Sequence, residues 1–242
     1  MKRFHVPLID ARYWAAILAA SVFGTNLGDL YAHESGLGIW LGLLVLVALA
    51  AAAFVGERVD TRPRELWYWL VIIIIRTGAT NIADWLAFRA HVPKVILVVV
   101  LAALIALFGH WSAARTKSSQ GGEKYLPNTG AAYWAAMLSA GVFGTVLGDV
   151  CSHAVGELIA SAALLMLLGT AFALRARAVL KPIASYWVTV AVARTAGTAV
   201  GDWLAENDTL RIGLAVSTVV TGAAFLLILV AWPRTPIRSE RV

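Results

Sequence analysis

Eight apolar stretches, each close in length to a membrane-spanning helix, take up most of this chain. A helix needs about 20 mainly apolar residues to cross the hydrocarbon core of a bilayer. Only 14% of the residues are charged, whereas a soluble domain carries about 25%. The stretches lie near residues 13–32, 37–56, 66–88, 92–111, 131–150, 157–174, 183–204 and 210–232. The sequence therefore predicts an all-α, polytopic membrane bundle of eight transmembrane helices, with no room for a soluble catalytic domain.

The basic residues indicate how these helices are oriented. Fifteen of the 20 Lys and Arg residues fall before the first stretch, after the last one and in alternate loops, whereas the other loops contain only Arg89, Lys94 and Arg211. An excess of basic residues in short loops is typical of the cytoplasmic side. We therefore expect both termini to be cytoplasmic. This distribution explains the net charge of +6, so the charge does not indicate nucleic-acid binding.

One phrase of the sequence occurs four times without gaps, which indicates internal duplication. Each copy begins with Tyr-Trp, has a threonine eleven residues after the tryptophan, and has an aspartate four residues after the threonine. The copies are YWAAILAASVFGTNLGD (13–29), YWLVIIIIRTGATNIAD (68–84), YWAAMLSAGVFGTVLGD (133–149) and YWVTVAVARTAGTAVGD (186–202). Copies one and three are most alike, as are copies two and four, so the chain is a duplicated half.

This duplication predicts the organisation of the chain. Residues 1–111 form a first half and residues 131–242 a second half, joined by a polar cytoplasmic linker at 112–130. Each half holds two helix-hairpin repeats, and because each repeat has two spans, all four repeats share one orientation. Repeats of this kind are related by an axis along the membrane normal. We therefore expect a pseudo-twofold bundle in which the odd-numbered spans carry the shared chemistry and the even-numbered spans face lipid or serve as scaffold.

The four repeats resemble a family of bacterial inner-membrane proteins with four tandem two-helix repeats, each carrying a characteristic tryptophan. The resemblance covers residues 12–232, and the matching tryptophans are Trp14, Trp69, Trp134 and Trp187. It implies a multi-pass protein of the bacterial inner membrane. The family has no assigned function, so the resemblance supplies no activity.

The repeated threonine and aspartate are the first candidate functional residues. A spacing of four places each pair on one helix face, and each aspartate lies roughly 24 Å along its helix from the tyrosine of the same copy. An ionisable group inside a transmembrane helix suggests function by default. The pairs are Thr25/Asp29, Thr80/Asp84, Thr145/Asp149 and Thr198/Asp202. Either they form an outer acidic layer, or each aspartate accepts local hydrogen bonds and fixes a hairpin.

Two arginines, Arg76 and Arg194, precede these pairs by four residues in copies two and four. A charge near the middle of the membrane is costly. Three explanations are open: a buried ion pair with an aspartate of a neighbouring repeat, a gate that an incoming cation or proton displaces, or a binding pair for an anion. Copies one and three have Ser21 and Gly141 instead, so the chemistry is twofold rather than fourfold.

Copies one and three add a histidine four residues after the aspartate, which gives the pairs Asp29/His33 and Asp149/His153. Two ligands at positions i and i+4 of a helix can chelate one metal ion. Two carboxylates and two imidazoles together suit a first-row divalent ion. The sequence thus predicts a divalent metal site and indicates no other cofactor, and the alternative is a pair of ordinary interfacial histidines.

The remaining residues of the phrase have structural explanations. Glycines at a spacing of four allow helix backbones to approach closely in lipid, and they form the pairs Gly24/Gly28, Gly144/Gly148 and Gly197/Gly201. The Tyr-Trp pairs, with Trp85 and Trp203, are expected to form aromatic belts at the two membrane interfaces.

Together these residues favour a transporter or permeation pathway for cations, in particular a divalent metal ion, and not an enzyme. The aspartates would form an outer acidic layer of the pathway with the threonines beneath it. His33 and His153 would be ligands at its mouth, and Arg76 and Arg194 would block it near the middle of the membrane. One rival is proton-coupled transport of a small anion or organic solute bound by the arginines. The other is a membrane scaffold whose polar residues only lock the helices together. The expected partners are lipid and a small ion or solute, and a second copy of the chain is left open.

Overall fold

The computed structural model describes residues 7–60, 62, 64–114, 129–179, 181–207 and 210–232, and contains eight α-helices in this part of the chain. They are α1 (Ala11–Glu34), α2 (Gly38–Val59), α3 (Leu66–Asp84), α4 (Lys94–Ala114), α5 (Ala131–Val155), α6 (Glu157–Ala176), α7 (Pro182–Glu206) and α8 (Gly213–Ala231). Each predicted span corresponds to one helix, and α3 continues into a short π-helix, η1 (Trp85–Arg89). The all-α repeat architecture is confirmed.

Six of the described helices are long and apolar enough to cross a membrane: α2, α3 with η1, α4, α5, α6 and α8. In the even-numbered helices only 17% to 28% of the apolar window is buried, against 50% and 56% in α3 and α5. Large apolar side chains cover their exposed faces, among them Leu44, Val99, Met166 and Leu226. The even-numbered helices therefore present surfaces suited to lipid, as in a multi-pass membrane protein.

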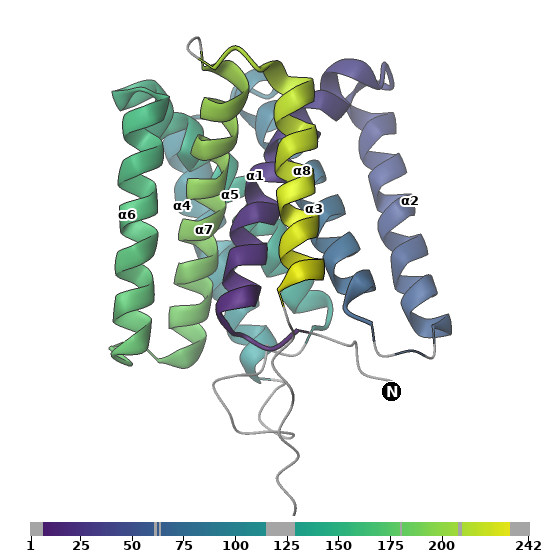
Figure 1. The fold of residues 1–242 in the computed structure, drawn as a ribbon, viewed down its shortest axis with the longest axis vertical. Coiled ribbons are helices and arrows are strands. Elements are labelled where there is room, and N and C mark those ends of the chain that lie inside the picture. The colour runs from purple at the N-terminus through teal and green to yellow at the C-terminus, as the bar shows by residue number, and fades with distance from the viewer. Residues whose placement is uncertain are drawn as a thin grey trace, which may run out of the picture.

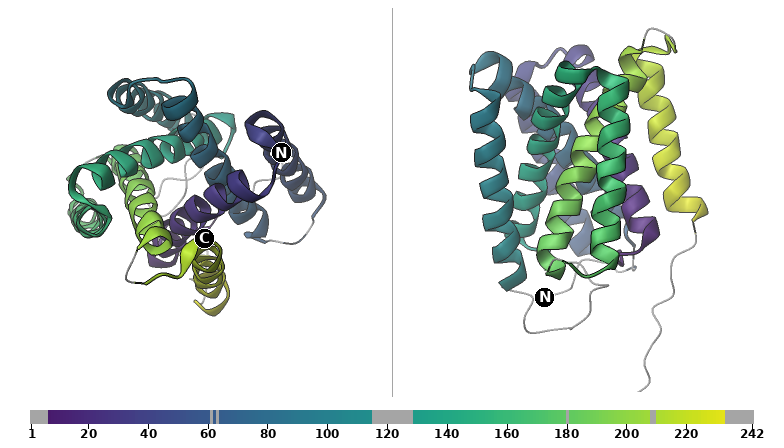
Figure 2. Two further views of the ribbon diagram at one scale, coloured as in Figure 1. Left: turned by 90° about the horizontal axis from the view of Figure 1, so that it is seen from above. Right: turned by 90° about the vertical axis from the view of Figure 1, so that its left-hand side faces the viewer.

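The four odd-numbered helices form an inner ring, and the even-numbered helices pack outside it (Figure 1 and Figure 2). Within the ring, α1 packs against α3 and α7, and α5 packs against the same two helices. The ring therefore joins both halves of the chain into one bundle. All odd-numbered helices run in the same direction (Figure 1). The Tyr-Trp pairs thus lie together at one end, the tyrosine end, and the repeated aspartates lie toward the other, the aspartate end.

Each even-numbered helix packs mainly on the odd-numbered helix that follows it in the sequence rather than on the one that precedes it. α2 packs on α3, α4 on α5, α6 on α7, and α8 returns to the start of the chain to pack on α1. α1 and α2 belong to one sequence repeat but barely touch. The helix pairs that pack together are therefore shifted by one helix relative to the sequence repeats. The contact between α8 and α1 joins the last helix to the first.

Arg12 stabilises the contact between α1 and α8. It is counted by sequence among the basic residues of the cytoplasmic side, yet its side chain is buried in the first turn of α1. Its guanidinium forms an ion pair with Glu65 at 2.7 Å and donates a hydrogen bond to the carbonyl of Leu229, near the end of α8, at 3.0 Å. The start of the first helix is thereby tied to the end of the last.

The predicted linker at 112–130 starts later than expected because α4 continues to Ala114. Residues 115–128 of that linker lie outside the described residues.

Glycines set the distance between the inner helices. A Cβ atom on Gly148 would lie 2.8 Å from the Cβ of Thr198, and one on Gly197 would overlap the Cβ of Ser21. Carbon atoms prefer separations of about 3.5–4.0 Å, so no larger residue has room at these positions. The small residues of the repeated phrase allow close helix packing, as the sequence indicates.

We predict that Gly197→Ala lowers the free energy of unfolding by about 1–3 kcal/mol, the usual cost of overpacking. Gly169→Ala on α6 is the matched control, because no atom lies within 4 Å of a Cβ at that position. It should be neutral or stabilising, since alanine favours a helix over glycine by up to about 1 kcal/mol. Thermal unfolding of both purified variants in one detergent measures the difference. Equal stability would contradict the packing role of Gly197.

Candidate functional site

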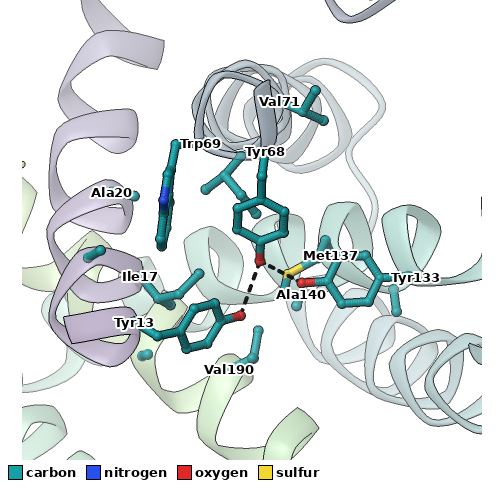
Figure 3. Close-up of a cluster of buried hydrophobic side chains, with 14 of the residues drawn as sticks. Tyr13, Ile17, Ala20, Tyr68, Trp69, Val71, Tyr133, Met137, Ala140 and Val190 are labelled. Atoms are coloured by element: carbon teal, nitrogen blue, oxygen red, sulfur yellow. Dashed lines mark hydrogen bonds between the residues drawn. The ribbon is translucent and has the colours of Figure 1, made fainter. Parts of the chain in front are cut away.

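The tyrosines of the four repeats close the tyrosine end of the inner ring. Their hydroxyl oxygens are 3.2 Å apart for Tyr13 and Tyr68, 2.7 Å for Tyr68 and Tyr133, 2.9 Å for Tyr133 and Tyr186, and 2.6 Å for Tyr186 and Tyr13. Figure 3 shows the hydroxyl of Tyr68 between its two neighbours. Because a phenol hydroxyl can donate one bond and accept another, this closed circle satisfies all four groups without water.

The tryptophan of each repeat packs on the tyrosine of the preceding repeat. The ring centres of Trp69 and Tyr13 are 5.9 Å apart, and those of Trp14 and Tyr186 are 5.7 Å apart. All four Tyr-Trp pairs are buried, with at most 8% exposure. The prediction that they form an interfacial belt is therefore wrong. The tyrosine hydroxyls satisfy one another at the bundle axis, which allows the aromatic area to be buried between helices.

The guanidinium of Arg76 lies on the axis of the inner ring and is fully buried. It donates hydrogen bonds to the repeated threonines of all four inner helices. Nη1 donates to Thr80 at 3.0 Å and to Thr145 at 2.8 Å, while Nη2 donates to Thr198 at 2.6 Å and to Thr25. The four threonines that the sequence places on equivalent helix faces thus meet on one cation, and we call them the threonine ring.

The threonine hydroxyls direct their lone pairs toward this cation. The hydroxyl of Thr25 donates to the carbonyl of Ser21 at 2.9 Å, and that of Thr198 donates to the carbonyl of Arg194 at 3.2 Å. The other two make the same bond one turn back at 3.4 Å. This local bonding to the i−4 carbonyl uses the hydroxyl hydrogen. Four neutral oxygens are left as acceptors around one point, and the guanidinium occupies that point.

Arg194 holds the equivalent position on α7 and is equally buried, but its side chain points toward the tyrosine end. Its Nη1 donates to the hydroxyl of Ser21 at 3.2 Å, and its Nη2 contacts the sulfur of Met137 at 4.0 Å. Gly141 stands where the other half has Ser21. Arg76 therefore finds no serine hydroxyl at the depth of Gly141, and its guanidinium donates to the threonine ring instead.

Neither arginine forms the ion pair with an aspartate that was one of the sequence-based explanations. Among the described residues, no carboxylate oxygen lies within 4.0 Å of the guanidinium of Arg76 or Arg194. The Nε atoms of both side chains also lack hydrogen-bond partners there. Neutral hydroxyl groups are thus the partners that stabilise the buried charge of Arg76.

A cavity of about 390 Å³, which we call the vestibule, lies at the aspartate end with the threonine ring in its wall. The four repeated aspartates line it, together with His33, His153, Glu157 and Glu206. The threonines are buried, the aspartates half-buried and the histidines exposed, so the wall runs from the dry centre of the bundle to an open mouth. Every predicted site residue except Arg194 lines this cavity or binds its threonines.

The two histidines are held in the same way. Nδ1 of His33 and Nδ1 of His153 each lie 2.7 Å from the backbone carbonyl oxygen of the aspartate four residues earlier. A carbonyl only accepts, so Nδ1 carries the hydrogen, and in the neutral imidazole Nε2 has the lone pair. Among the described residues, no three His, Cys, Asp or Glu side chains form a group that could hold a metal ion. The predicted metal ligands therefore share a cavity without forming a preassembled centre.

Sequence reasoning missed two parts of the site. The tyrosine circle was detectable, since the tyrosine keeps a constant spacing from the threonine in all four copies and must converge if the threonines converge. Glu157 lies outside the repeated phrase, and although the acidic residues as a group lie toward the same side as the aspartates, the spacing within the phrase does not place it in the site.

The fold and the site define a multi-pass helical membrane protein with a polar axis, sealed by tyrosines at one end and lined by carboxylates at the other. Residues 12–58 and 185–237 match the model of a family described as Repeat of Unknown Function (DUF347). These segments cover nearly all of α1 with α2 and of α7 with α8, the first and last of the four repeats. The resemblance to an uncharacterised repeat family is thereby confirmed. No curated protein and no solved structure shows significant similarity to the chain.

Thr145→Val tests the threonine ring with a nearly isosteric change. We expect it to lower the free energy of unfolding by about 1.5–3 kcal/mol, because a hydrogen bond to a buried charge is lost. Thr170→Val on α6 is the matched control: Thr170 is exposed, and its hydroxyl makes the same bond one turn back, to Met166 at 3.0 Å. That variant should stay within about 0.5 kcal/mol of wild type. If unfolding in one detergent shows equal losses for both, the threonine ring does not stabilise Arg76.

Proposed function

We propose that this protein transports small cations across the membrane, with the vestibule as the entrance and Arg76 as the gate. One observation carries the proposal: four threonine oxygens already bind a cation, the Arg76 guanidinium, on the bundle axis. These oxygens would serve an incoming cation in the same way once the guanidinium moved aside. Because the guanidinium is part of the protein, it can leave the threonine oxygens when a cation enters and return to them afterwards, and so it blocks the pathway reversibly.

The charge of the vestibule supports cations over anions. Six carboxyl groups line it, four from the repeats and two from Glu157 and Glu206. A cleft lined by one sign of charge with low-dielectric walls concentrates counter-ions, and rings of Asp or Glu are a common means of cation selection. An anion approaching Arg76 from this side would have to pass all of these groups.

The way Arg76 is held supports a gate rather than a fixed structural charge. Its partners are neutral hydroxyls, each hydrogen bond contributing about 1.5–3 kcal/mol, and no carboxylate in the described part of the chain adds a direct ion pair. A cation bound among the aspartates would repel the guanidinium while competing for the same oxygens. Displacement of Arg76 is then driven by the substrate itself.

Beyond the threonine ring, the path toward the tyrosine end passes Arg194 and the tyrosine circle. Both are fully or almost fully buried, so we assign this conformation to a state open only at the aspartate end. The excess of basic residues in the loops of the tyrosine end supports an orientation with the aspartate end outside the cytoplasm.

Among cations, we favour a divalent metal ion. His33 and His153 line the vestibule with the aspartates, and neutral imidazole with carboxylate suits first-row divalent ions. Because the described residues contain no preassembled centre, the side chains would have to converge on the ion as it binds.

Flux into proteoliposomes with trapped indicators tests the gate, using manganese, zinc and thallium as probe ions. We expect Arg76→Gln to conduct the transported cation several-fold faster than wild type, because glutamine leaves the threonine ring without its resident charge. Arg58→Gln, which removes an exposed arginine at the end of α2, is the matched control and should leave the flux unchanged.

Two other results would contradict the proposal. Uptake of an anion that disappears in Arg76→Gln would assign the arginine to anion binding. The absence of flux for every ion in wild type and variant, together with a lower unfolding temperature of Arg76→Gln, would leave the scaffold explanation.

A further inference from the structure

A second cavity, of about 550 Å³, lies beside the vestibule between the aspartate-end portions of α1, α2, α3 and η1. Four aromatic side chains line it: Tyr31, Trp40, Trp85 and Phe88. Asp84 and Phe88 line both cavities, so the two share part of their wall. α2 packs on α3 but barely touches α1, and the cavity lies where these helices do not meet.

The aromatic wall has a defined geometry. The ring centres of Trp40 and Trp85 lie 5.1 Å apart with an interplanar angle of 64°, so the two indoles form a corner. Tyr31 is fixed by its hydroxyl, which donates to the carbonyl of Gly42 at 3.0 Å. Aromatic faces gathered around one space attract cations through their quadrupoles, and they recognise ammonium groups in this way.

The polar groups of the wall are mainly acceptors. Asn81 donates from Nδ2 to the carbonyls of Gly28 at 3.1 Å and Thr77 at 2.9 Å, which uses both amide hydrogens. Its side chain is only 6% exposed, and its Oδ1 can only accept a hydrogen bond. Asp84 adds a carboxylate. The basic residue of the wall, Arg89, is exposed at the rim, where water screens its charge.

We infer that this cavity binds an organic cation, an ammonium or quaternary ammonium group with apolar substituents. The aromatic faces and Asp84 would bind the charge of either group, and Oδ1 of Asn81 would accept a hydrogen bond only from a ligand that carries an N–H. Phe88, 55% exposed, would cover apolar substituents at the rim. A small hydrated metal ion would gain little from such walls.

The second half of the chain does not repeat this wall. The positions aligned with Tyr31, Trp40 and Phe88 hold Cys151, Ala160 and Glu206. At the end of α3 the backbone forms the π-helical turn η1, whereas α7 continues as an α-helix to Glu206. Single π-helical turns occur frequently at functional sites. Packing requirements common to both halves therefore do not account for Tyr31, Trp40 and Phe88, whereas Trp85 has Trp203 as its counterpart.

This inference deepens the proposed cation pathway and rests on it in one respect only. Since Asp84 also lines the vestibule, an organic cation in the second cavity lies at the entrance of the pathway and is a candidate for its cargo. Binding itself does not depend on transport and can be measured separately.

Equilibrium binding of tritiated tetraphenylphosphonium to the purified protein tests the site, with benzyltrimethylammonium as competitor. Trp40→Ala and Trp85→Ala should each weaken binding by about two- to thirtyfold, the range expected for one cation–π contact. Trp85→Phe should restore most of the affinity, because it keeps an aromatic face. Trp111→Ala is the matched control, since Trp111 is exposed at the tyrosine end of α4, and its affinity should equal that of wild type.

The absence of saturable binding to wild type would overturn the inference, as would equal affinities of the Trp40→Ala, Trp85→Ala and Trp111→Ala variants. Nanodiscs with and without phosphatidylcholine identify the source of the ammonium group. Competition by this lipid supports a headgroup site, and its absence supports a site for a free solute. Binding without any cation flux contradicts only the proposed cation transport, whereas flux without binding contradicts only this site.

Discussion

One buried guanidinium organises the polar axis of this protein. Arg76 donates hydrogen bonds to one threonine from each of the four inner helices, so a single side chain links all members of the ring at one depth. A charge at this depth is tolerated only where it is well bonded. The requirement for four acceptors at one level thus restricts the relative rotation and register of α1, α3, α5 and α7.

The close approach of the helices is the condition for this arrangement, and the same repeated phrase supplies it. A Cβ on Gly24 would lie 2.8 Å from the Cβ of Arg76, and one on Gly144 would lie 2.6 Å from the Cβ of Arg194. Each glycine thus leaves room for the stem of an arginine on the neighbouring helix. Packing and polar chemistry are encoded together, which explains why the odd-numbered helices keep the phrase while the even-numbered helices vary.

The sequence predicted the helices, their shared orientation and the meeting of the repeated threonines. These followed because gapless repetition in parallel helices places equivalent residues at equal depth. The opposite directions of Arg76 and Arg194 were not predictable from spacing, since they depend on Ser21 and Met137 across two helix interfaces. The burial of the Tyr-Trp pairs was not predictable either, because such a pair at a helix end is compatible with a membrane interface and with a bundle axis. The second cavity arises from the separation of α1 and α2, which no pattern in the chain encodes.

The most direct measurement is an experimental structure of the protein saturated with the cation that it conducts fastest in proteoliposomes. The account predicts density for the ion between the aspartates and the threonine ring, with the guanidinium of Arg76 moved away from the threonine oxygens. A guanidinium that still bonds all four threonines at saturation, with no ion in the vestibule, would contradict the claim that Arg76 occupies the place of a transported cation.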